Sequence, residues 1–294
     1  MLRSFRSFNS NDRAGSAALA VDTAHHFGAK VGRSTRRNRH LGNAGRNRAD
    51  GQRLEADDGV EGMRAGREND FMIVVHHLNN SRSQRVLWLL EELGLDYQVK
   101  RYERDPATML APASLRAVHP LGKAPVITDG DLTLAESGAI IEYLAERYGA
   151  GRLVPATGTP DRLRCTYWMH YAEGSAMPPL LLKLVFDRVQ DAPMPFFIRP
   201  IARAIAGRAK SSFIEPQIKL HLDFMESELA KSPWFAGNDF TAADIQMSFP
   251  LEAAAARAGL DATRPKLVAF LEHIHARPAY RRALEKGGAY ELLR

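Results

Sequence analysis

The sequence predicts an α/β domain followed by an all-helical domain. Between residues 71 and 152, short apolar runs alternate with stretches of helical periodicity, whereas no strand-like run occurs from 159 to 294. The length of 294 residues suits this division, because one domain takes about 150 residues on average. We therefore predict two domains, at 71–152 and 159–294, joined by a short linker.

Residues 1–70 are predicted to lie outside both domains. They are rich in Arg, Asn, Gly and Ser and have no sustained apolar period, so we expect a disordered basic extension. An Arg-rich start is typical of organellar transit peptides. A simpler interpretation is that translation begins at Met72 or Met63, because an apolar strand follows Met72 directly.

The α/β domain should begin with a strand, a helix and a second strand. Residues 73–78 form a short apolar run, and residues 83–93 carry Val and Leu at helical spacing before Gly94, a typical C-terminal cap. Residues 97–102 alternate as a strand, and a proline-punctuated helical stretch runs on to Val118. The two strands of this βαβ unit should pair in parallel.

Two more strands and a helix complete the domain. Residues 124–128 and 132–135 are strand-like and flank Asp129-Gly130, a strong hairpin signal. A helix should start near Glu136 and stop at Gly149. The domain therefore joins a βαβ half to a ββα half.

The second domain should contain helices only. Thr159 is a typical N-cap before Pro160 in the first helical turn, and Pro178-Pro179 should break or kink the helix that follows. Thr241 and Asp244 form a capping box, which we interpret as a folding element and not as a catalytic acid. Further helices are predicted at about 211–230, 241–258, 265–276 and 278–286.

Charge and cysteine content exclude several classes of protein. Of the 40 Lys/Arg and 34 Asp/Glu residues, residues 1–70 hold 13 and 9, which leaves 27 and 25 in the remainder. A nearly neutral body does not suit a nucleic-acid groove, so we expect no nucleic-acid partner. Cys165 is the only cysteine, which excludes an internal disulfide and favours a reducing, cytoplasmic location.

Membrane and cofactor signals are also missing from the sequence. No apolar run approaches the ~20 residues of a membrane-spanning helix, so we expect no membrane partner. The neighbours His76 and His77 lie on a strand and point to opposite faces, which disfavours joint metal binding. There is no P-loop, HExxH or Rossmann glycine pattern, so we expect no metal or nucleotide.

Three motifs carry a family resemblance. LGKAPVI at 121–127, LAESGAIIEYL at 134–144 and FTAADI at 240–245, in this order, resemble the cytosolic glutathione S-transferase family, in particular its serine-type, bacterial and fungal members. The likeness covers about residues 72–290. It implies the glutathione transferase fold, with a thioredoxin-like N-terminal domain that binds glutathione and an all-α C-terminal domain that binds the electrophile. It also implies a homodimer.

The resemblance implies roles for five residues in binding glutathione. A cis bond between Ala124 and Pro125 would turn the Ala124 backbone toward the cysteinyl part, and such a bond is accessible to a fold. Ser137 would bind the γ-glutamyl carboxylate at a positive helix end, and Glu136 would bind the ammonium group. Lys123 would attract the glycyl carboxylate.

The resemblance also places the group that activates the thiol in the turn after the first strand. A free thiol has a pKa of ~8.5 and is only ~3% thiolate at neutral pH. A hydrogen bond to the thiolate would lower that pKa by about one to two units. We choose Ser81, four residues before Arg85, as the catalytic donor, with Asn80 as the alternative. Ser83 is interpreted as an N-cap, and no tyrosine occurs between Phe71 and Gly94.

The implied function is a detoxifying glutathione transferase. Its bound thiolate would attack an electrophilic carbon or a peroxide oxygen, with at most one of Tyr167, Tyr171 and Met177 lining the acceptor site. Two alternatives stay open. One is a non-catalytic binding module with the same architecture, and the other is a glutathione-dependent isomerase or dehalogenase.

Overall fold

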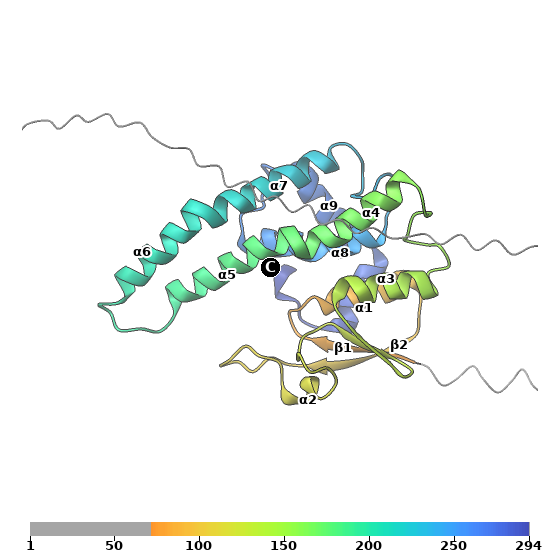
Figure 1. The fold of residues 1–294 in the computed structure, drawn as a ribbon, viewed down its shortest axis with the longest axis horizontal. Coiled ribbons are helices and arrows are strands. Elements are labelled where there is room, and N and C mark those ends of the chain that lie inside the picture. The colour runs from red at the N-terminus through yellow and green to blue at the C-terminus, as the bar shows by residue number, and fades with distance from the viewer. Residues whose placement is uncertain (1–71, 294) are drawn as a thin grey trace, which may run out of the picture. The chain divides into compact units, whose positions relative to one another are not determined.

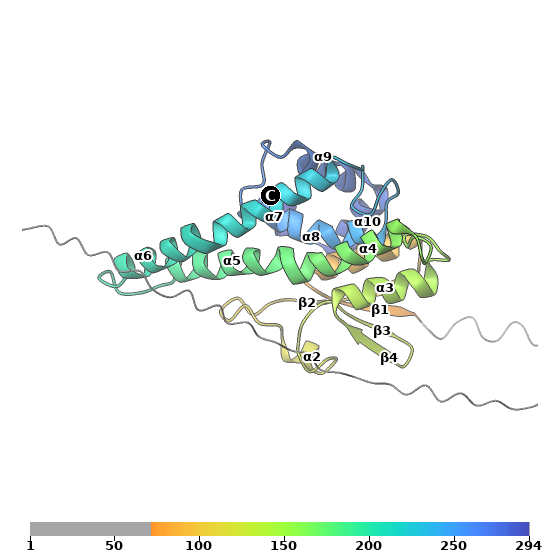
Figure 2. The same ribbon diagram turned by 45° about the horizontal axis from the view of Figure 1, so that its top comes forward.

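The computed structural model describes residues 72–293, so the prediction for residues 1–70 lies outside the described residues. The first part of the described chain is a four-stranded sheet with helices, as predicted (Figure 2). Its elements are β1 Ile73–Leu78, α1 Ser83–Leu93, β2 Tyr97–Tyr102, α2 Ala113–Arg116, β3 Val126–Asp129, β4 Leu132–Ala135 and α3 Ser137–Tyr148.

The sheet has the strand order β2-β1-β3-β4. The β1 and β2 strands are parallel, with Ile73 opposite Tyr97, whereas β3 is antiparallel to both β1 and β4. This confirms the predicted βαβ and ββα halves. The β1 strand is central, so the turn that follows it opens at the edge where β1 and β2 both end.

The α1 helix confirms the local sequence signals. It is buried along almost its whole length and ends at Gly94, whose left-handed φ of 67° lets its N–H bond the carbonyls of Glu91 and Leu90. The α2 helix is shorter than predicted, because Pro112 stands at its N-cap and only four residues are helical. The prediction of a helical stretch up to Val118 was therefore wrong in length.

The rest of the described chain is helical, as predicted. No strand follows Ala135 within the described residues. The elements are α4 Pro160–Tyr171, η1 Ala172–Ala176, α5 Met177–Asp191, α6 Arg199–Ala209, η2 Lys210–Ile214, α7 Glu215–Leu229, α8 Ala242–Arg257, α9 Pro265–Ala276, α10 Pro278–Gly287 and η3 Glu291–Leu293. The sequence missed α6.

The break predicted at Pro178-Pro179 takes the form of a π-helical turn. The α4 helix continues through η1 into α5, so the three elements form one long rod (Figure 1). Because neither proline has an N–H, the carbonyls of Gly174 and Ser175 lack their usual helical donors, and the turn before the prolines widens. The widened turn carries Glu173.

The α8 helix forms the core of the helical domain. Asp244 is fully buried, and its carboxylate accepts hydrogen bonds from the N–H groups of Thr241, at 2.8 Å, and Phe235, at 2.9 Å. The Thr241 hydroxyl lies 3.1 Å from the same carboxylate. The carboxylate therefore starts α8 and fixes the preceding loop, which agrees with its predicted role in folding.

Replacing Asp244 by asparagine should destabilise the protein by about 1–2 kcal/mol. One amide oxygen replaces two carboxylate oxygens, so one buried N–H loses its acceptor. Denaturant unfolding of the purified variant would measure the loss. Asp131, which is exposed in the turn between β3 and β4, provides the control, because Asp131→Asn should change stability very little. Equal stability of the Asp244 variant and the wild type would contradict this role.

Residues 72–293 contain neither a candidate metal-ion cluster nor a candidate membrane-spanning helix. No three His, Cys, Asp or Glu side chains in this part of the chain gather closely enough to hold a metal ion. The same part has no helix that is both long and apolar enough to cross a membrane.

Candidate active site

Two asparagines in the turn between β1 and α1 form hydrogen bonds with two other segments of the chain. The Asn79 side-chain oxygen accepts the N–H of Arg104 at 3.1 Å, just after β2. The Asn80 side-chain oxygen accepts the N–H of Glu291 at 2.8 Å, from the C-terminal η3 segment. Asn80 itself has a left-handed φ of 50°, which asparagine tolerates better than most residues. The turn is therefore fixed by contacts with both domains.

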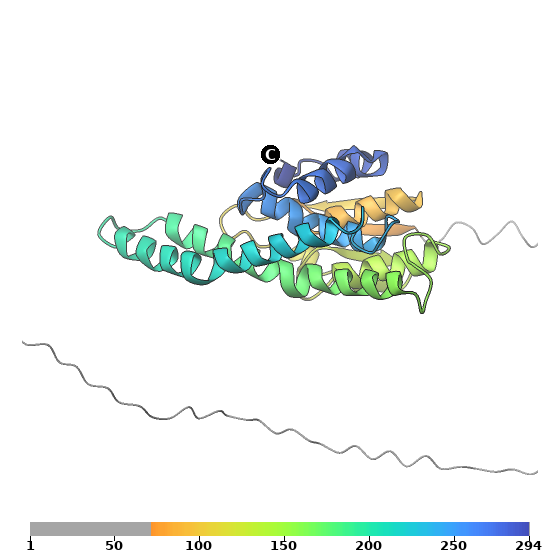
Figure 3. The same ribbon diagram turned by 90° about the horizontal axis from the view of Figure 1, so that it is seen from above.

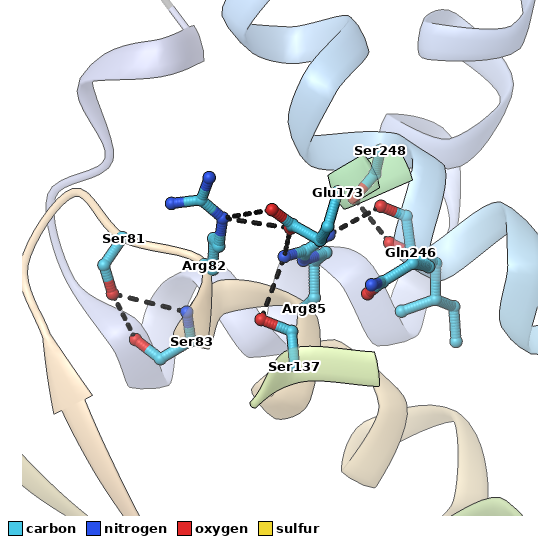
Figure 4. A network of polar contacts seen from close by, with 9 residues as sticks. Ser81, Arg82, Ser83, Arg85, Ser137, Glu173, Gln246 and Ser248 are labelled. Carbon is cyan, nitrogen blue, oxygen red and sulfur yellow. Dashed lines mark hydrogen bonds and ion pairs between the residues drawn. The ribbon is translucent and has the colours of Figure 1, made fainter. Parts of the chain in front are cut away.

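Ser81 is buried within this turn. Its Oγ atom lies 2.7 Å from the Oγ atom of Ser83 and accepts the Ser83 N–H at 3.3 Å (Figure 4). The Ser83 hydroxyl in turn lies 2.8 Å from Nδ1 of His77. Three side chains thus form a short hydrogen-bonded chain that starts at the turn and ends on β1.

The direction of this hydrogen-bonded chain follows from the state of His77. Burial lowers the pKa of His77 to about 4, and Arg101 acts in the same direction, against a hydrogen bond to the Gly287 backbone. The ring is therefore neutral at pH 7, and with the other nitrogen donating to Gly287, Nδ1 accepts the Ser83 hydroxyl hydrogen. The Ser83 oxygen then accepts from Ser81.

Ser83 is not the N-cap that the sequence predicted. The N-cap residue of α1 is Arg82, and Ser83 is the first helical residue. The prediction was wrong because a serine at the start of a helix is ordinarily free to cap it, whereas here a neighbouring histidine on β1 takes up the hydroxyl. Only the tertiary pairing of His77 and Ser83 shows this.

Arg85 is the centre of a buried polar network that joins four elements. Its side chain is 1% exposed. Its Nη1 donates to the Gln246 carbonyl at 2.7 Å, and its Nη2 donates to Ser137 Oγ at 3.0 Å and to Glu173 at 2.6 Å (Figure 4). Arg85 therefore links α1 with the N-terminus of α3, with α8 and with the π-helical turn.

Glu173 is the counter-ion of two arginines. Both of its oxygens accept from Nε of Arg82, at 2.9 and 3.0 Å, in addition to the bond from Arg85. Burial acts to raise the pKa of Glu173, but the guanidinium groups of Arg85 and Arg82 outweigh it and hold the pKa below its ordinary value. Both guanidinium groups also lie over the Phe249 ring, at 5.0 and 5.3 Å.

The N-terminus of α3 begins as predicted. Ser137 is its first residue and is buried, whereas Glu136 is exposed at the N-cap with a φ of 73°. The Ala124–Pro125 bond is cis, which confirms the prediction. Lys123 is exposed at the surface beside this bond. Of these residues, only Ser137 is joined to the Arg85 network by a described hydrogen bond.

The three acceptor candidates lie in different surroundings. Tyr171 is buried and its hydroxyl is 2.6 Å from Nδ1 of His221, and Tyr167 stacks on Tyr171 with ring centres 5.6 Å apart. Met177 instead packs in a cluster with Phe249, the ring that lies under both arginines. Met177 is therefore the one candidate whose cluster adjoins the site.

Sequence reasoning missed the roles of Arg85 and Glu173. The sequence indicates Arg85 only as a marker for Ser81, although an arginine followed directly by the apolar run from Val86 to Leu90 is itself a sign of a buried charge. Glu173 lies 88 residues further along the chain, and only the proline pair after it marks an irregular turn. Neither of these two signals shows that Arg85 and Glu173 pair with each other.

Comparison with protein families agrees with this geometry. The family model of the glutathione S-transferase N-terminal domain matches residues 71–146, and that of the C-terminal domain matches residues 190–278. The two matched regions include Ser81, Arg85 and Ser137 in the first and Gln246 in the second.

Individual relatives support the same family. Glutathione S-transferase 3 of Schizosaccharomyces pombe is 37% identical over 73% of this chain and 88% of its own length. Glutathione S-transferase 1 of Saccharomyces cerevisiae is 33% identical over 74% of this chain and 96% of its own. A glutathione S-transferase structure from Actinobacillus pleuropneumoniae superposes with a TM-score of 0.63 at 35% identity, covering 76% of this chain and 96% of its own. The chain therefore belongs to the glutathione S-transferase family and is a glutathione transferase.

Proposed function

We propose that glutathione binds along the thioredoxin-like domain, with its γ-glutamyl end at Ser137 and its thiol at Ser81. The observation that carries this is that two buried serines lie at the starts of two helices, Ser81 just before α1 and Ser137 in the first turn of α3, and that the buried Arg85 of α1 donates to Ser137. Helix N-termini attract anions, and glutathione brings a carboxylate and a thiolate. Glu136, Ala124, Pro125 and Lys123 complete the proposed contacts.

The Arg85 network prepares Ser137 for a carboxylate. Because Nη2 of Arg85 donates to Ser137 Oγ, the serine oxygen is already an acceptor and its hydrogen is left to donate to a ligand. The positive charge of Arg85 and the positive N-terminal end of α3 both attract an anion to this position. Glu136 at the same helix start supplies the negative charge for the γ-glutamyl ammonium group.

The Ser81 hydroxyl would activate the thiol by a hydrogen bond. Without glutathione this hydroxyl donates to Ser83, so binding requires only a rotation of the O–H toward the sulfur. The N-terminal end of α1 adds a favourable electrostatic contribution to the thiolate. No general base is needed, because a pKa lowered by one to two units makes enough thiolate at neutral pH.

Relatives and exposed surfaces support the finer parts of the proposal. A sphingomonad glutathione S-transferase, 28% identical with a TM-score of 0.56, is described in complex with glutathione. Leu132 on β4 and Leu163 on α4 are exposed apolar residues that a second copy would cover in the proposed homodimer. We propose a cytoplasmic homodimer that detoxifies electrophiles or peroxides.

Retention on immobilised glutathione, followed by assays with an electrophile and with a peroxide, tests the proposal. Binding without turnover of either substrate would favour the non-catalytic module, and turnover only of a halogenated or isomerisable substrate would favour the second alternative. No retention and no saturable activity with glutathione would contradict the proposed binding mode.

Replacing Ser137 by alanine should weaken glutathione binding by about 1–1.5 kcal/mol, roughly tenfold. This value lies at or below the lower limit of the ~1.5–3 kcal/mol for a hydrogen bond to a charged group, because Arg85 keeps its bond to Glu173 and the helix end is unchanged. Calorimetric titration would measure the affinity, and thermal unfolding would report any separate loss of stability. Thr133→Ala, exposed on β4, is the control. An unchanged affinity in a folded Ser137 variant would reject the assignment.

A further inference from the structure

The hairpin formed by α5 and α6 carries an unusual surface at its tip. We call residues 192–214 the hairpin tip. They comprise the loop after α5, the α6 helix and η2, and the hairpin extends past the end of the β-sheet in two views (Figures 1 and 3). Large apolar side chains in this segment are exposed to solvent: Phe196 by 81%, Phe197 by 64%, Ile201 by 60%, Ile205 by 61% and Phe213 by 57%.

These side chains form a patch and are not scattered. The Phe196 and Phe197 rings contact each other edge to face, with centres 5.6 Å apart. Ile198 at the N-cap of α6 and Ile201 and Ile205 within the helix are spaced by three and four residues and so lie on one face of it. Soluble proteins rarely leave such a contiguous apolar surface without a partner.

The same segment is purely cationic. Residues 192–214 contain Arg199, Arg203, Arg208 and Lys210 and no Asp or Glu. Lys210 is paired with Asp187 at 2.8 Å, but the three arginines are exposed and form no ion pair with any residue that the structure describes. Arg199 instead donates to the Met194 carbonyl at 3.2 Å, which fixes the start of α6 against the loop.

We propose that the hairpin tip binds to the surface of anionic membranes. A helix with an apolar face and arginines lies in the interfacial plane, where its apolar residues reach the boundary of headgroups and acyl chains. Phe196 and Phe197 would enter this boundary, and the arginines would contact lipid phosphates. This partner differs from the sequence prediction of no membrane contact, which considered only spanning helices.

The charges favour a lipid surface over a second copy of this chain. A twofold-symmetric dimer through the tip would bring two cationic segments together, and residues 192–214 have no Asp or Glu to pair with the arginines of the other copy. Like charges on facing surfaces oppose association. An anionic membrane satisfies both kinds of group, because its acyl chains contact the apolar side chains and its headgroup phosphates contact the arginines.

Co-sedimentation of the full chain with lipid vesicles tests the proposal. The protein should bind vesicles of phosphatidylcholine mixed with phosphatidylglycerol more tightly than vesicles of phosphatidylcholine alone, and the binding should weaken as salt is added. The double variant Phe196→Ser/Phe197→Ser should bind the mixed vesicles at least about tenfold more weakly. Arg199→Gln/Arg203→Gln should also bind more weakly and lose much of the salt dependence.

Matched variants distinguish the tip from the rest of the surface. Leu220→Ser on α7 removes a side chain that is 61% exposed, and Arg257→Gln removes an exposed arginine on α8, so neither should change vesicle binding. Transferase activity in solution should be unchanged in every tip variant, which makes the test independent of catalysis. Equal sedimentation of wild type with and without vesicles, or of tip variants and wild type, would overturn the proposal. A tip variant that becomes monomeric without losing vesicle binding would assign the patch to a second copy instead.

Discussion

Replacing Glu173 by glutamine should lower the free energy of unfolding by about 3 kcal/mol. The substitution leaves Arg85 with a buried charge and no carboxylate, and breaking a buried ion pair from one side costs ~3–5 kcal/mol. We place the value at the low end because one third of the Glu173 side chain is exposed and water can partly replace it. Urea unfolding of both proteins would measure the difference.

An exposed ion pair provides the matched control. Glu146 on α3 pairs with Arg162 at 3.0 Å, but its side chain is 58% exposed. Glu146→Gln should therefore change stability by less than about 0.5 kcal/mol. If both glutamine variants lost the same stability, the burial of Arg85 would not be the cause.

The loss of stability caused by Glu173→Gln should become smaller at low pH. Burial opposes ionisation, but Arg85 and Arg82 lower the pKa of Glu173 below its ordinary value, so the folded protein favours the carboxylate. Ionised Glu173 therefore contributes its full stabilisation above the pKa of the unfolded state, ~4.3, and this stabilisation is lost as the pH falls through the lower pKa of the folded state. The difference between wild type and Glu173→Gln should shrink as the pH falls below about 4, measured by urea unfolding across that range.

Replacing Ser81 by alanine should slow conjugation at neutral pH by roughly ten- to twenty-five-fold. The variant loses the proposed hydroxyl donor to the thiolate, so the pKa of bound glutathione should rise by about one to two units. Glutathione should still bind, because Ser137 and Arg85 are untouched. Ultraviolet absorbance of the bound thiolate across pH would give the pKa directly, and part of the rate should return at alkaline pH.

Two neighbouring variants separate Ser81 from its alternatives. Ser83→Ala removes the hydrogen bond to His77 and should cost about 1 kcal/mol of stability while most of the rate remains. Asn80→Ala removes the acceptor of the Glu291 N–H and tests the amide as a donor. If the bound thiol titrates at the same pH in Ser81→Ala and wild type, and shifts in Asn80→Ala, the catalytic assignment belongs to Asn80.

The sequence by itself determined the order of the elements in the α/β domain and several of their ends, but not α6 or the length of α2. The left-handed stop at Gly94, the start of α8 at Thr241 and Asp244, and the cis bond before Pro125 all agree with prediction. The first two are local: a few adjacent residues contain both the donor and the acceptor, or the conformational preference, that defines the feature. The cis bond was reached through the family resemblance.

Only the tertiary structure decided which polar groups meet. Arg85 pairs with Glu173 across 88 residues, and Ser83 turns to His77 instead of capping α1. It also decided that Ile201 and Ile205 stay exposed, because helical periodicity shows which face is apolar and not whether another element covers it. Contacts between distant segments depend on how whole elements pack, and a linear pattern of residues does not contain that information.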